Sequence, residues 1–149
     1  DQQTKEQIIA YTDGGSRGNP GPAAIGVAIY KGTGELLKSY GQTIGVATNN
    51  EAEYAAVAFA LKKIKALFKK EKIKRMPITV NMDSELIVRQ LTGKYKIEQK
   101  RLFPLFIAIW NLRLDFGSIH FQHVPREQNK SADRLVNEAL DQEQVKLFP

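Results

Sequence analysis

The hydrophobic period of the chain changes at Thr48, and this change decides the order in which strands and helices can occur. Before Thr48, apolar residues alternate with small or polar ones, as at Ile25, Val27 and Ile29, which is typical of half-buried strands. We predict three strands, over residues 7–12, 23–31 and 35–44. A Gly-Thr-Gly turn at 32–34 joins the second strand to the third, so this part of the chain predicts an antiparallel meander.

After Thr48 the apolar residues recur at helical spacing. Asn49 or Asn50 is expected to cap a helix that continues to about Lys70. Its apolar face would carry Ala52, Ala56, Phe59, Ala60, Ile64 and Leu67. The remainder predicts a strand at 78–82, helices at 84–91 and 102–114, a strand at 118–124 and a helix at 129–140. This order of elements indicates a mixed sheet with helices on its faces.

The bulk composition excludes several classes of protein. The 149 residues fit one domain with its own core, in which residues 141–149 could form a C-terminal tail. No apolar run reaches about eighteen residues, so we expect no membrane span. The chain has no cysteine, which suits a reducing compartment, and we expect a cytoplasmic protein. Without thiolates, a metal site would use oxygen or imidazole ligands, which favours Mg²⁺ or Mn²⁺.

The net charge of +6 comes largely from one segment. Residues 62–75 contain eight basic residues and one acid, a net of +7, so the rest of the chain carries about −1. Cations at the end of a helix interact favourably with its dipole. A solvated helix end therefore explains this segment, and so does contact with nucleic acid. The sequence leaves both interpretations open.

The stretch YTDGGSRGNPGP, residues 11–22, places one acid, Asp13, between a strand and a glycine-rich loop. A phosphate-binding loop is one interpretation, but the glycine spacing does not match GxGxxG and no GK[ST] occurs. A strand follows the loop, so no helix N-terminus is available there to hold an anion. We therefore interpret Asp13 as a metal-binding carboxylate at the end of the first strand. The glycines would let the chain reverse tightly into the second strand.

Three further acids occupy comparable places. Asp83 follows the fourth predicted strand, while Glu53 and Asp133 directly follow the core-facing Ala52 and Ala132. Any one of these acids alone could be an ordinary surface charge. Four that converge are harder to explain as structure, because clustered carboxylates repel unless cations neutralise them. Paired hard cations on such a cluster would activate a water for phosphodiester hydrolysis.

The segments YTDGGSxGNPGP, TNNEAE, MDSE and HVPRExNKxAD resemble the signature segments of type 1 ribonuclease H, in the family's order and spacing over roughly residues 7–140. The resemblance implies an α/β ribonuclease H-like fold. This fold has a five-stranded mixed sheet, in which strands one to three form an antiparallel meander and strands one, four and five are parallel. It also implies an endonuclease that cuts the RNA strand of an RNA–DNA hybrid with two Mg²⁺ or Mn²⁺ ions, leaving 3′-hydroxyl and 5′-phosphate ends.

The resemblance also assigns individual residues. It implies that Asp13, Glu53, Asp83 and Asp133 are the metal ligands, with Asp13 shared by both ions. His123 matches a histidine that assists proton transfer or product release. Substrate contacts would lie at Gly14, Gly15, Asn19, Asn49, Asn50 and Ser84, although Asn49 and Ser84 could equally cap helices.

One region departs from many members of the family. Residues 91–103 are short and lack the Trp-containing basic protrusion that grips the DNA strand, so the chain resembles the bacterial and archaeal form without it. Lys94, Tyr95, Lys96, Lys100 and Arg101 could partly replace this protrusion. The only tryptophan, Trp110, lies in an apolar segment and is expected in the core.

The last residues, QVKLFP at 144–149, support a separate prediction. Gln144, Leu147 and Phe148 resemble the short peptide by which bacterial replication proteins dock on the sliding clamp, although Leu147 and Phe148 could instead pack on the domain itself. We otherwise expect a monomer that binds the hybrid and no membrane. Two other functions stay open: a hybrid-binding module that does not cleave, and a resolvase- or transposase-like nuclease of the same fold.

Overall fold

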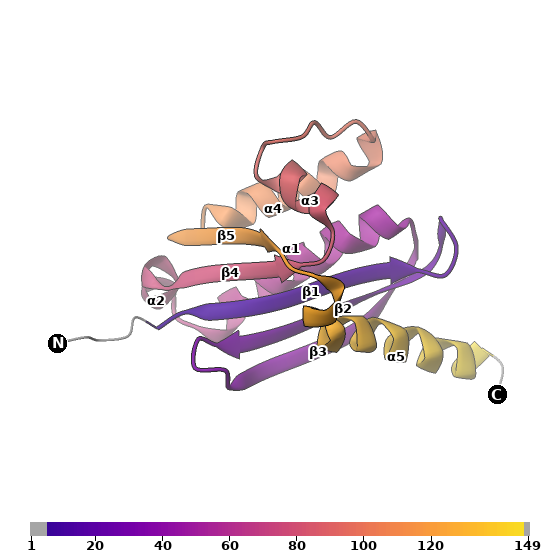
Figure 1. Ribbon diagram of the computed structural model, residues 1–149, viewed down its shortest axis with the longest axis horizontal. Helices are drawn as coiled ribbons and strands as arrows, with labels where there is room; N and C mark the ends of the chain where they lie inside the picture. The colour runs from indigo at the N-terminus through magenta and orange to yellow at the C-terminus, as the bar shows by residue number, and fades with distance from the viewer. Residues whose placement is uncertain (1–5, 148–149) are drawn as a thin grey trace.

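Five strands form one mixed sheet in the computed structural model, which describes residues 6–147, with Leu147 described by its backbone alone. The strands are β1 (Ile8–Ser16), β2 (Gly21–Lys31), β3 (Leu36–Ala47), β4 (Pro77–Met82) and β5 (Ser118–His123). Their order across the sheet is β3-β2-β1-β4-β5 (Figure 1). Strands β1 to β3 pair antiparallel, while β4 is parallel to β1 and to β5. The predicted mixed sheet is therefore confirmed.

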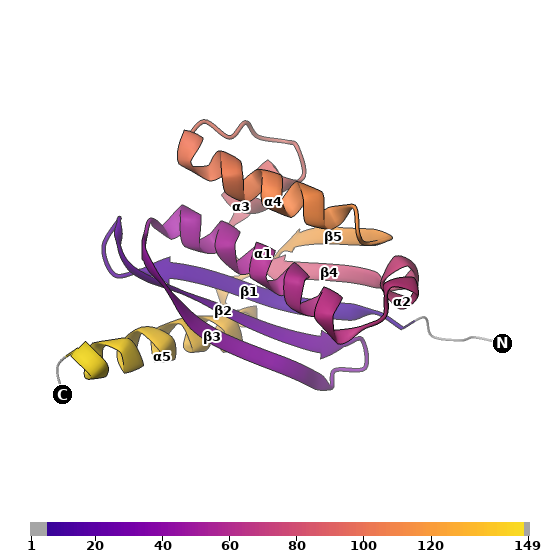
Figure 2. The same ribbon diagram turned by 180° about the vertical axis from the view of Figure 1, so that it is seen from behind.

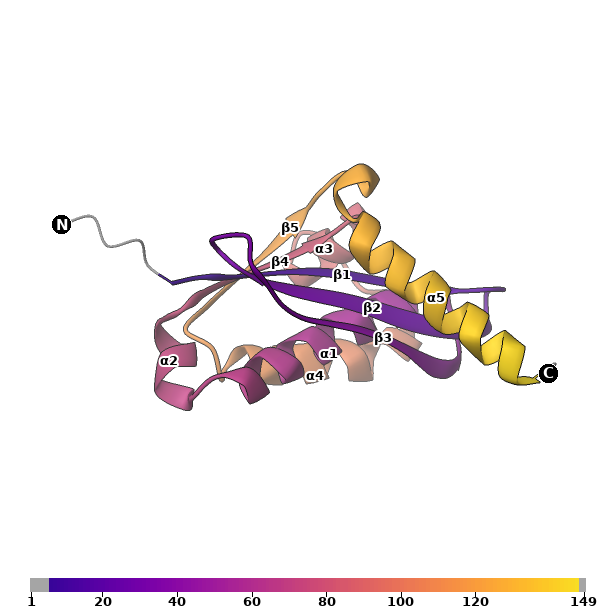
Figure 3. The same cartoon turned by 90° about the horizontal axis from the view of Figure 1, so that it is seen from below.

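Helices cover both faces of this sheet. They are α1 (Asn49–Leu67), α2 (Lys70–Arg75), α3 (Glu85–Leu91), α4 (Phe103–Arg113) and α5 (Lys130–Leu147). Two 3-10 turns lie at Lys100–Leu102 and Arg126–Gln128. Helices α1 and α4 lie side by side on one face, and α5 crosses the other face over β2 and β3 (Figure 2, Figure 3). Within the described residues, no helix combines the length and the apolar character that a membrane crossing needs.

The main core lies between the sheet and α1. The buried side chains of α1 include Ala52, Ala56, Ala60 and Ile64, as the spacing predicted. Tyr54 is also fully buried, and its hydroxyl donates to Gln90 Oε1 at 2.7 Å, which ties α1 to α3. A smaller core under α5 contains Ala24, Val136, Ala139 and Leu140. The predicted inner face of the last helix is confirmed at Ala132, Val136 and Ala139, while Leu135 is half-buried.

The glycine-rich stretch is mostly strand, so the prediction that Asp13 ends the first strand is wrong. The pairing of β1 with β4 stops at Tyr11, but its antiparallel pairing with β2 continues to Ser16. The partner strand keeps the backbone extended in spite of two glycines. The chain reverses only in the short turn that follows, where the Arg17 N–H donates to the Pro22 carbonyl at 2.8 Å.

Helix boundaries also differ from those expected. Thr48, and not Asn49 or Asn50, is the N-cap of α1: its hydroxyl accepts from the Glu51 N–H, and the Glu51 carboxylate accepts from the Thr48 N–H. Helix α1 ends at Leu67 because Phe68 is extended, and the basic segment continues into the separate α2. Helix α5 continues past the predicted end at residue 140 to Leu147, so most of the expected tail is helical.

Trp110 is not in the core, contrary to expectation. The buried residue of α4 is Ile109, and successive helical residues point about 100° apart, so the next side chain turns toward solvent. Trp110 is 49% exposed. Its ring stacks on Phe106 and lies under the Arg113 guanidinium, 4.9 Å from the ring centre. The indole therefore packs against neighbouring side chains at the surface and not in the core.

Candidate active site

Strand β1 supplies Asp13 and helix α1 supplies Glu53, and a glycine lets the two elements meet. Gly14 lies against the first turn of α1, where a Cβ would overlap the backbone of Ala52 and Glu53. The Gly14 N–H donates to Glu53 Oε1 at 3.0 Å and holds this carboxylate against β1. Successive residues of a strand point to opposite faces, so Asp13 points toward the face that carries α5.

Strand β4 supplies the third carboxylate. Asp83 directly follows Met82, the last residue of β4. Because β4 runs parallel to β1, Asp83 arrives at the end of the sheet where Asp13 lies. One carboxylate oxygen from each of Asp13, Glu53 and Asp83 lies within 4.8 Å of the others. Within residues 6–147 this is the group of side chains that could hold a metal ion.

Helix α5 supplies Asp133, and a second glycine allows its approach. Gly26 is the partner of Asp13 in the β1–β2 pairing. A Cβ at Gly26 would overlap the carbonyl oxygen of Ala132, so α5 lies directly on the sheet at this point. The next residue, Asp133, is exposed and lies beside Asp13. The structure thus brings together the four predicted acids, although Asp133 does not belong to the tight group of three.

Two carboxyl groups at this site, those of Asp13 and Glu53, are harder to ionise than free ones. Burial raises the pKa of Asp13 from 3.8 to about 7, and the charges of Asp83 and Asp133 add to this rise. Burial also raises the pKa of Glu53 well above its usual value, with further contributions from the charges of Asp13 and Asp83. The Gly14 N–H opposes both changes by hydrogen bonding. Perturbed acids in a cluster of this kind are common at catalytic sites.

This set of donors fits a hard divalent cation. The three closest ligand atoms are all carboxylate oxygens, which suit Mg²⁺ or Mn²⁺ better than softer metals. A divalent cation would also offset the repulsion between carboxylates, which adds to the effect of burial on the pKa of Asp13 and Glu53. The site could therefore bind such an ion in the ionised state of its carboxylates.

A polar hollow of about 700 Å³ lies beside the N-terminus of α1. It is lined by Asn19, Thr48, Asn49, Asn50, Gln99, Lys100 and Arg101. Three of the predicted substrate contacts are thus in one place. Asn19 Oδ1 accepts from the Asn49 N–H, and Asn49 Oδ1 accepts from the Ser16 N–H, each at 2.9 Å. These two amides therefore also hold the turn after β1 against α1.

The other predicted contacts have mixed surroundings. Ser84 is the N-cap of α3, and its hydroxyl accepts from the Ile87 N–H at 3.3 Å. Gly15 is half-buried, with Val136 Cγ1 at 3.7 Å from the position of a Cβ. The space beside Gly14, in contrast, is filled by α1. Capping is thus confirmed for Ser84, whereas the substrate contacts remain predictions.

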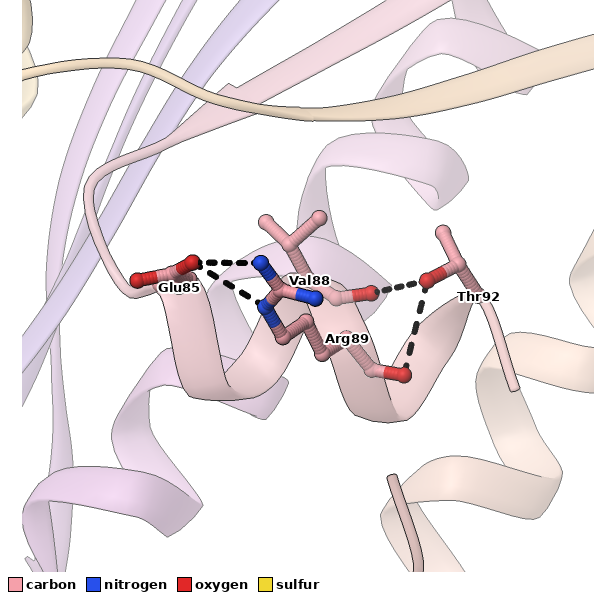
Figure 4. A network of polar contacts seen from close by, with 4 residues as sticks. All are labelled: Glu85, Val88, Arg89 and Thr92. Atoms are coloured by element: carbon pink, nitrogen blue, oxygen red, sulfur yellow. Dashed lines mark hydrogen bonds and ion pairs between the residues drawn. The ribbon is translucent and has the colours of Figure 1, made fainter. Parts of the chain in front are cut away.

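His123 is the last residue of β5, opposite Met82 and so near Asp83. It is exposed at the rim of the site. Glu85 lies close to it: the hydrogen bond and charge of Arg89 lower the pKa of Glu85, and the charge of His123 contributes to the same effect. Figure 4 shows Glu85 bonded to Arg89 one turn further along α3, at 2.8 and 3.0 Å.

Three residues that shape the site were not identified as such from the sequence. Gly26 and Asn129 place α5, and Thr48 fixes the start of α1. The Thr48–Glu51 spacing is a capping-box signal that could have been recognised. The close approach at Gly26 depends on a contact between distant segments, and no local pattern reveals it.

The basic segment 62–75 is partly used within the domain. Lys65 pairs with Asp115 at 2.7 Å, and Lys72 pairs with Glu6 at 3.1 Å. Lys63 lies over the rings of Tyr40 and Phe59. These contacts lie toward the C-terminal end of α1, whereas Glu53 lies near its beginning, so the segment does not form part of the acidic site.

Known proteins resemble the chain over most of its length. The family model described as reverse transcriptase-like matches residues 11–139. Ribonuclease HI of Halobacterium salinarum is 42% identical over 135 residues, which cover 91% of this chain and 65% of that protein. A bifunctional protein of Mycobacterium tuberculosis is 38% identical over 136 residues, covering 91% of the chain but 36% of the longer protein. The chain therefore spans between about a third and two thirds of these curated relatives.

Solved structures agree with this result. The crystal structure of RNase H1 from Halobacterium salinarum superposes with a TM-score of 0.84 at 40% identity, covering 91% of this chain and 98% of that one. LC11 RNase H1, isolated from compost, in complex with an RNA/DNA hybrid, gives 0.87 at 45% identity, with 93% and 99% covered. With the sheet order and the acidic site described above, these similarities show that the chain belongs to the type 1 ribonuclease H family.

Proposed function

We propose that this domain is an endonuclease that hydrolyses the RNA strand of RNA–DNA hybrids, leaving 3′-hydroxyl and 5′-phosphate ends. The convergence of Asp13, Glu53 and Asp83 within 4.8 Å carries the proposal. Asp133, whose charge contributes to the raised pKa of Asp13, lies beside this group. The hybrid bound to LC11 RNase H1, 45% identical to this chain, supports the choice of substrate.

The four carboxylates would hold two divalent ions, Mg²⁺ or Mn²⁺. Asp13 would contact both ions, Glu53 and Asp83 would contact one, and Asp133 would contact the other. When bound, such ions supply an activated water and stabilise the leaving oxygen. The carboxylates themselves must be ionised to serve as ligands. The raised pKa of Asp13 and Glu53 therefore predicts weak metal binding in acid and stronger binding as the pH rises through neutrality.

The chain supplies proton transfer and substrate contacts around these acids. The His123 imidazole, exposed at the rim, can accept or deliver a proton at the scissile phosphate. The polar hollow offers amide donors together with Lys100 and Arg101, which suit phosphate oxygens of a bound strand. Glu53 would accept a hydrogen bond from a ribose 2′-hydroxyl, the group that distinguishes RNA from DNA.

Cleavage of an end-labelled RNA–DNA hybrid tests this proposal, with duplex RNA and duplex DNA as controls and Mg²⁺, Mn²⁺ or EDTA present. We expect the RNA strand to be cut with either metal, EDTA to prevent it, and the products to carry 3′-hydroxyl and 5′-phosphate ends. Asp13→Asn should abolish cleavage, and His123→Ala should slow turnover without abolishing it. No cleavage in either metal, or full activity in Asp13→Asn, would contradict the proposal.

The same experiment separates the two alternatives. Tight binding of the hybrid without cleavage would indicate a binding module. Cleavage of duplex DNA in preference to the hybrid would indicate a resolvase- or transposase-like enzyme. The cluster of negative charge argues against a pure binding module, because carboxylates without bound cations would repel the phosphates of a nucleic acid. Cleavage with bound metal ions is therefore proposed.

The C-terminal contact with a sliding clamp stays a separate prediction for a domain that we expect to be monomeric. Gln144 lies at the surface near Arg17, while Phe148 and the side chain of Leu147 lie outside the described residues. A pull-down with clamp protein, using the full chain and a chain without residues 144–149, tests it. Equal capture by the two chains would remove the idea.

A further inference from the structure

Asn129 is fully buried at the start of α5, although residues 125–128 before it and Lys130 after it are exposed. An amide side chain is expensive to bury unless it makes hydrogen bonds. Its placement in an otherwise exposed segment therefore needs a reason.

The side chain reaches β1 directly before the first catalytic carboxylate. Asn129 Nδ2 donates to the Thr12 carbonyl oxygen at 2.9 Å. Thr12 is the first residue of β1 beyond the parallel pairing with β4, which ends at Tyr11 and Asn81. Asn129 therefore takes up a backbone acceptor at the point where the two strands separate, and Asp13 is the next residue.

The backbone of Asn129 is bonded to Asp133. The Asp133 N–H donates to the Asn129 carbonyl oxygen at 3.1 Å, in the first turn of α5. One residue thus links the backbone before Asp13 to the residue that carries the fourth carboxylate. Ala132, in the same turn, lies against Gly26 on the neighbouring strand β2.

The oxygen of the Asn129 amide has different surroundings from its nitrogen. Asn129 Oδ1 is buried and has no hydrogen-bond partner among the described residues. A buried acceptor without a partner is unfavourable. The one hydrogen bond that the described residues offer to this buried amide is therefore the one from Nδ2 to the Thr12 carbonyl oxygen.

We propose that Asn129 is a positioning residue that sets Asp133 at the correct place beside Asp13 for binding of the second metal ion. The proposal rests on the proposed function, in which Asp133 is a metal ligand. Because Asn129 is buried, it touches neither metal nor substrate and acts through α5. Removal of its donor should let the first turn of α5 shift while the rest of the helix stays packed through Val136, Ala139 and Leu140.

Metal binding without nucleic acid provides a readout that is independent of activity. Mn²⁺ titrations followed by electron paramagnetic resonance would compare the wild type with Asn129→Ala and with the nearly isosteric Asn129→Leu. We expect one Mn²⁺ to bind about 10- to 100-fold more weakly in both variants, the range typical of residues behind metal ligands. Asn137→Ala is the matched control, because Asn137 Nδ2 also bonds Asp133, at its carbonyl oxygen 3.1 Å away, but does not reach β1. Its Mn²⁺ affinity should match the wild type.

A double-mutant cycle with Asp133→Asn separates positioning from general stability. If Asn129 acts through Asp133, Asn129→Leu should strongly weaken Mn²⁺ binding and lower kcat when Asp133 is present. In the Asp133→Asn background the same substitution should have little effect on either quantity. The KM for the hybrid should not change. Additive losses in the cycle, or unchanged Mn²⁺ affinity in a variant with wild-type urea unfolding, would overturn the proposal. A wild type that binds Mn²⁺ but does not cut hybrids would instead count against the proposed function.

Discussion

Replacement of Asp13 by Asn should stabilise the metal-free protein at neutral pH while abolishing cleavage. Burial raises the pKa of Asp13 from 3.8 to about 7, and the neighbouring charges of Asp83 and Asp133 contribute. Above pH 7 Asp13 is ionised in both states, but its charge is less favourable in the folded protein than in the unfolded chain, which lowers the free energy of unfolding. Asparagine has a similar shape and no charge, so it removes this cost.

The magnitude follows from linkage. Each unit between the folded and the unfolded pKa corresponds to about 1.4 kcal/mol, so a rise from 3.8 to about 7 corresponds to about 4 kcal/mol at most. We expect Asp13→Asn to gain about 2–4 kcal/mol at pH 8. The sign is set by proton binding: between pH 4 and pH 7 the folded state retains a proton that the unfolded chain has released. The free energy of unfolding of the wild type therefore falls as the pH rises through this window, and the gain of the variant disappears near pH 4.

Urea unfolding in EDTA, followed by circular dichroism at pH 8 and pH 4, measures this difference. Asp141→Asn is the control, since it makes the same chemical change at an exposed aspartate that pairs with Arg17 at 2.7 Å. An exposed ion pair contributes at most about 1 kcal/mol, so the control should show no gain. Equal or lower stability of Asp13→Asn at pH 8 would refute the assignment of burial and like charges as the cause. Addition of Mg²⁺ should stabilise the wild type and not this variant.

Other substitutions test different parts of the site. Glu53→Gln should also raise the free energy of unfolding at pH 8 in EDTA, because burial raises the pKa of Glu53, and the gain should vanish near pH 4. Gly26→Ala should destabilise the protein by about 1–3 kcal/mol, because its Cβ would overlap the Ala132 carbonyl; unchanged urea unfolding would show that α5 can move freely. Tyr54→Phe should cost about 1–2 kcal/mol in the same assay, because it leaves Gln90 Oε1 buried without its donor.

The sheet and the acids could be predicted because their signals are local. Alternation such as Ile25, Val27 and Ile29 indicates a strand whatever the rest of the chain does. Asp83 is found by its place directly after an apolar strand, and parallel strands end at the same edge of a sheet. Asp13 was also identified from its expected place at the end of a strand. That expectation about the strand was wrong, since β1 continues to Ser16.

The errors arose where partners distant in sequence decide the outcome. Two glycines after Asp13 predicted a loop, but pairing with β2 keeps the backbone extended. Trp110 is a large apolar residue in an apolar segment, which predicted a place in the core. The packing of Ile109 sets the rotation of α4 and turns Trp110 toward solvent. The buried position of Asn129 follows from a hydrogen bond to Thr12, which lies on a distant segment. None of these contacts has a periodic or compositional signal.

The carboxylates converge because the backbone brings them together against their mutual repulsion. Gly14 admits α1 from one face of the sheet, and Gly26, the pairing partner of Asp13, admits α5 from the other. Asp13 therefore lies between two helices, each of which packs its backbone directly against a glycine of the sheet. Each helix brings one acid close to Asp13. Neutralising one acid should change the charge of the site and leave this arrangement intact, whereas a methyl group at either glycine should change the arrangement and leave the charge. The two kinds of variant thus separate the electrostatic from the geometric requirements of the same site.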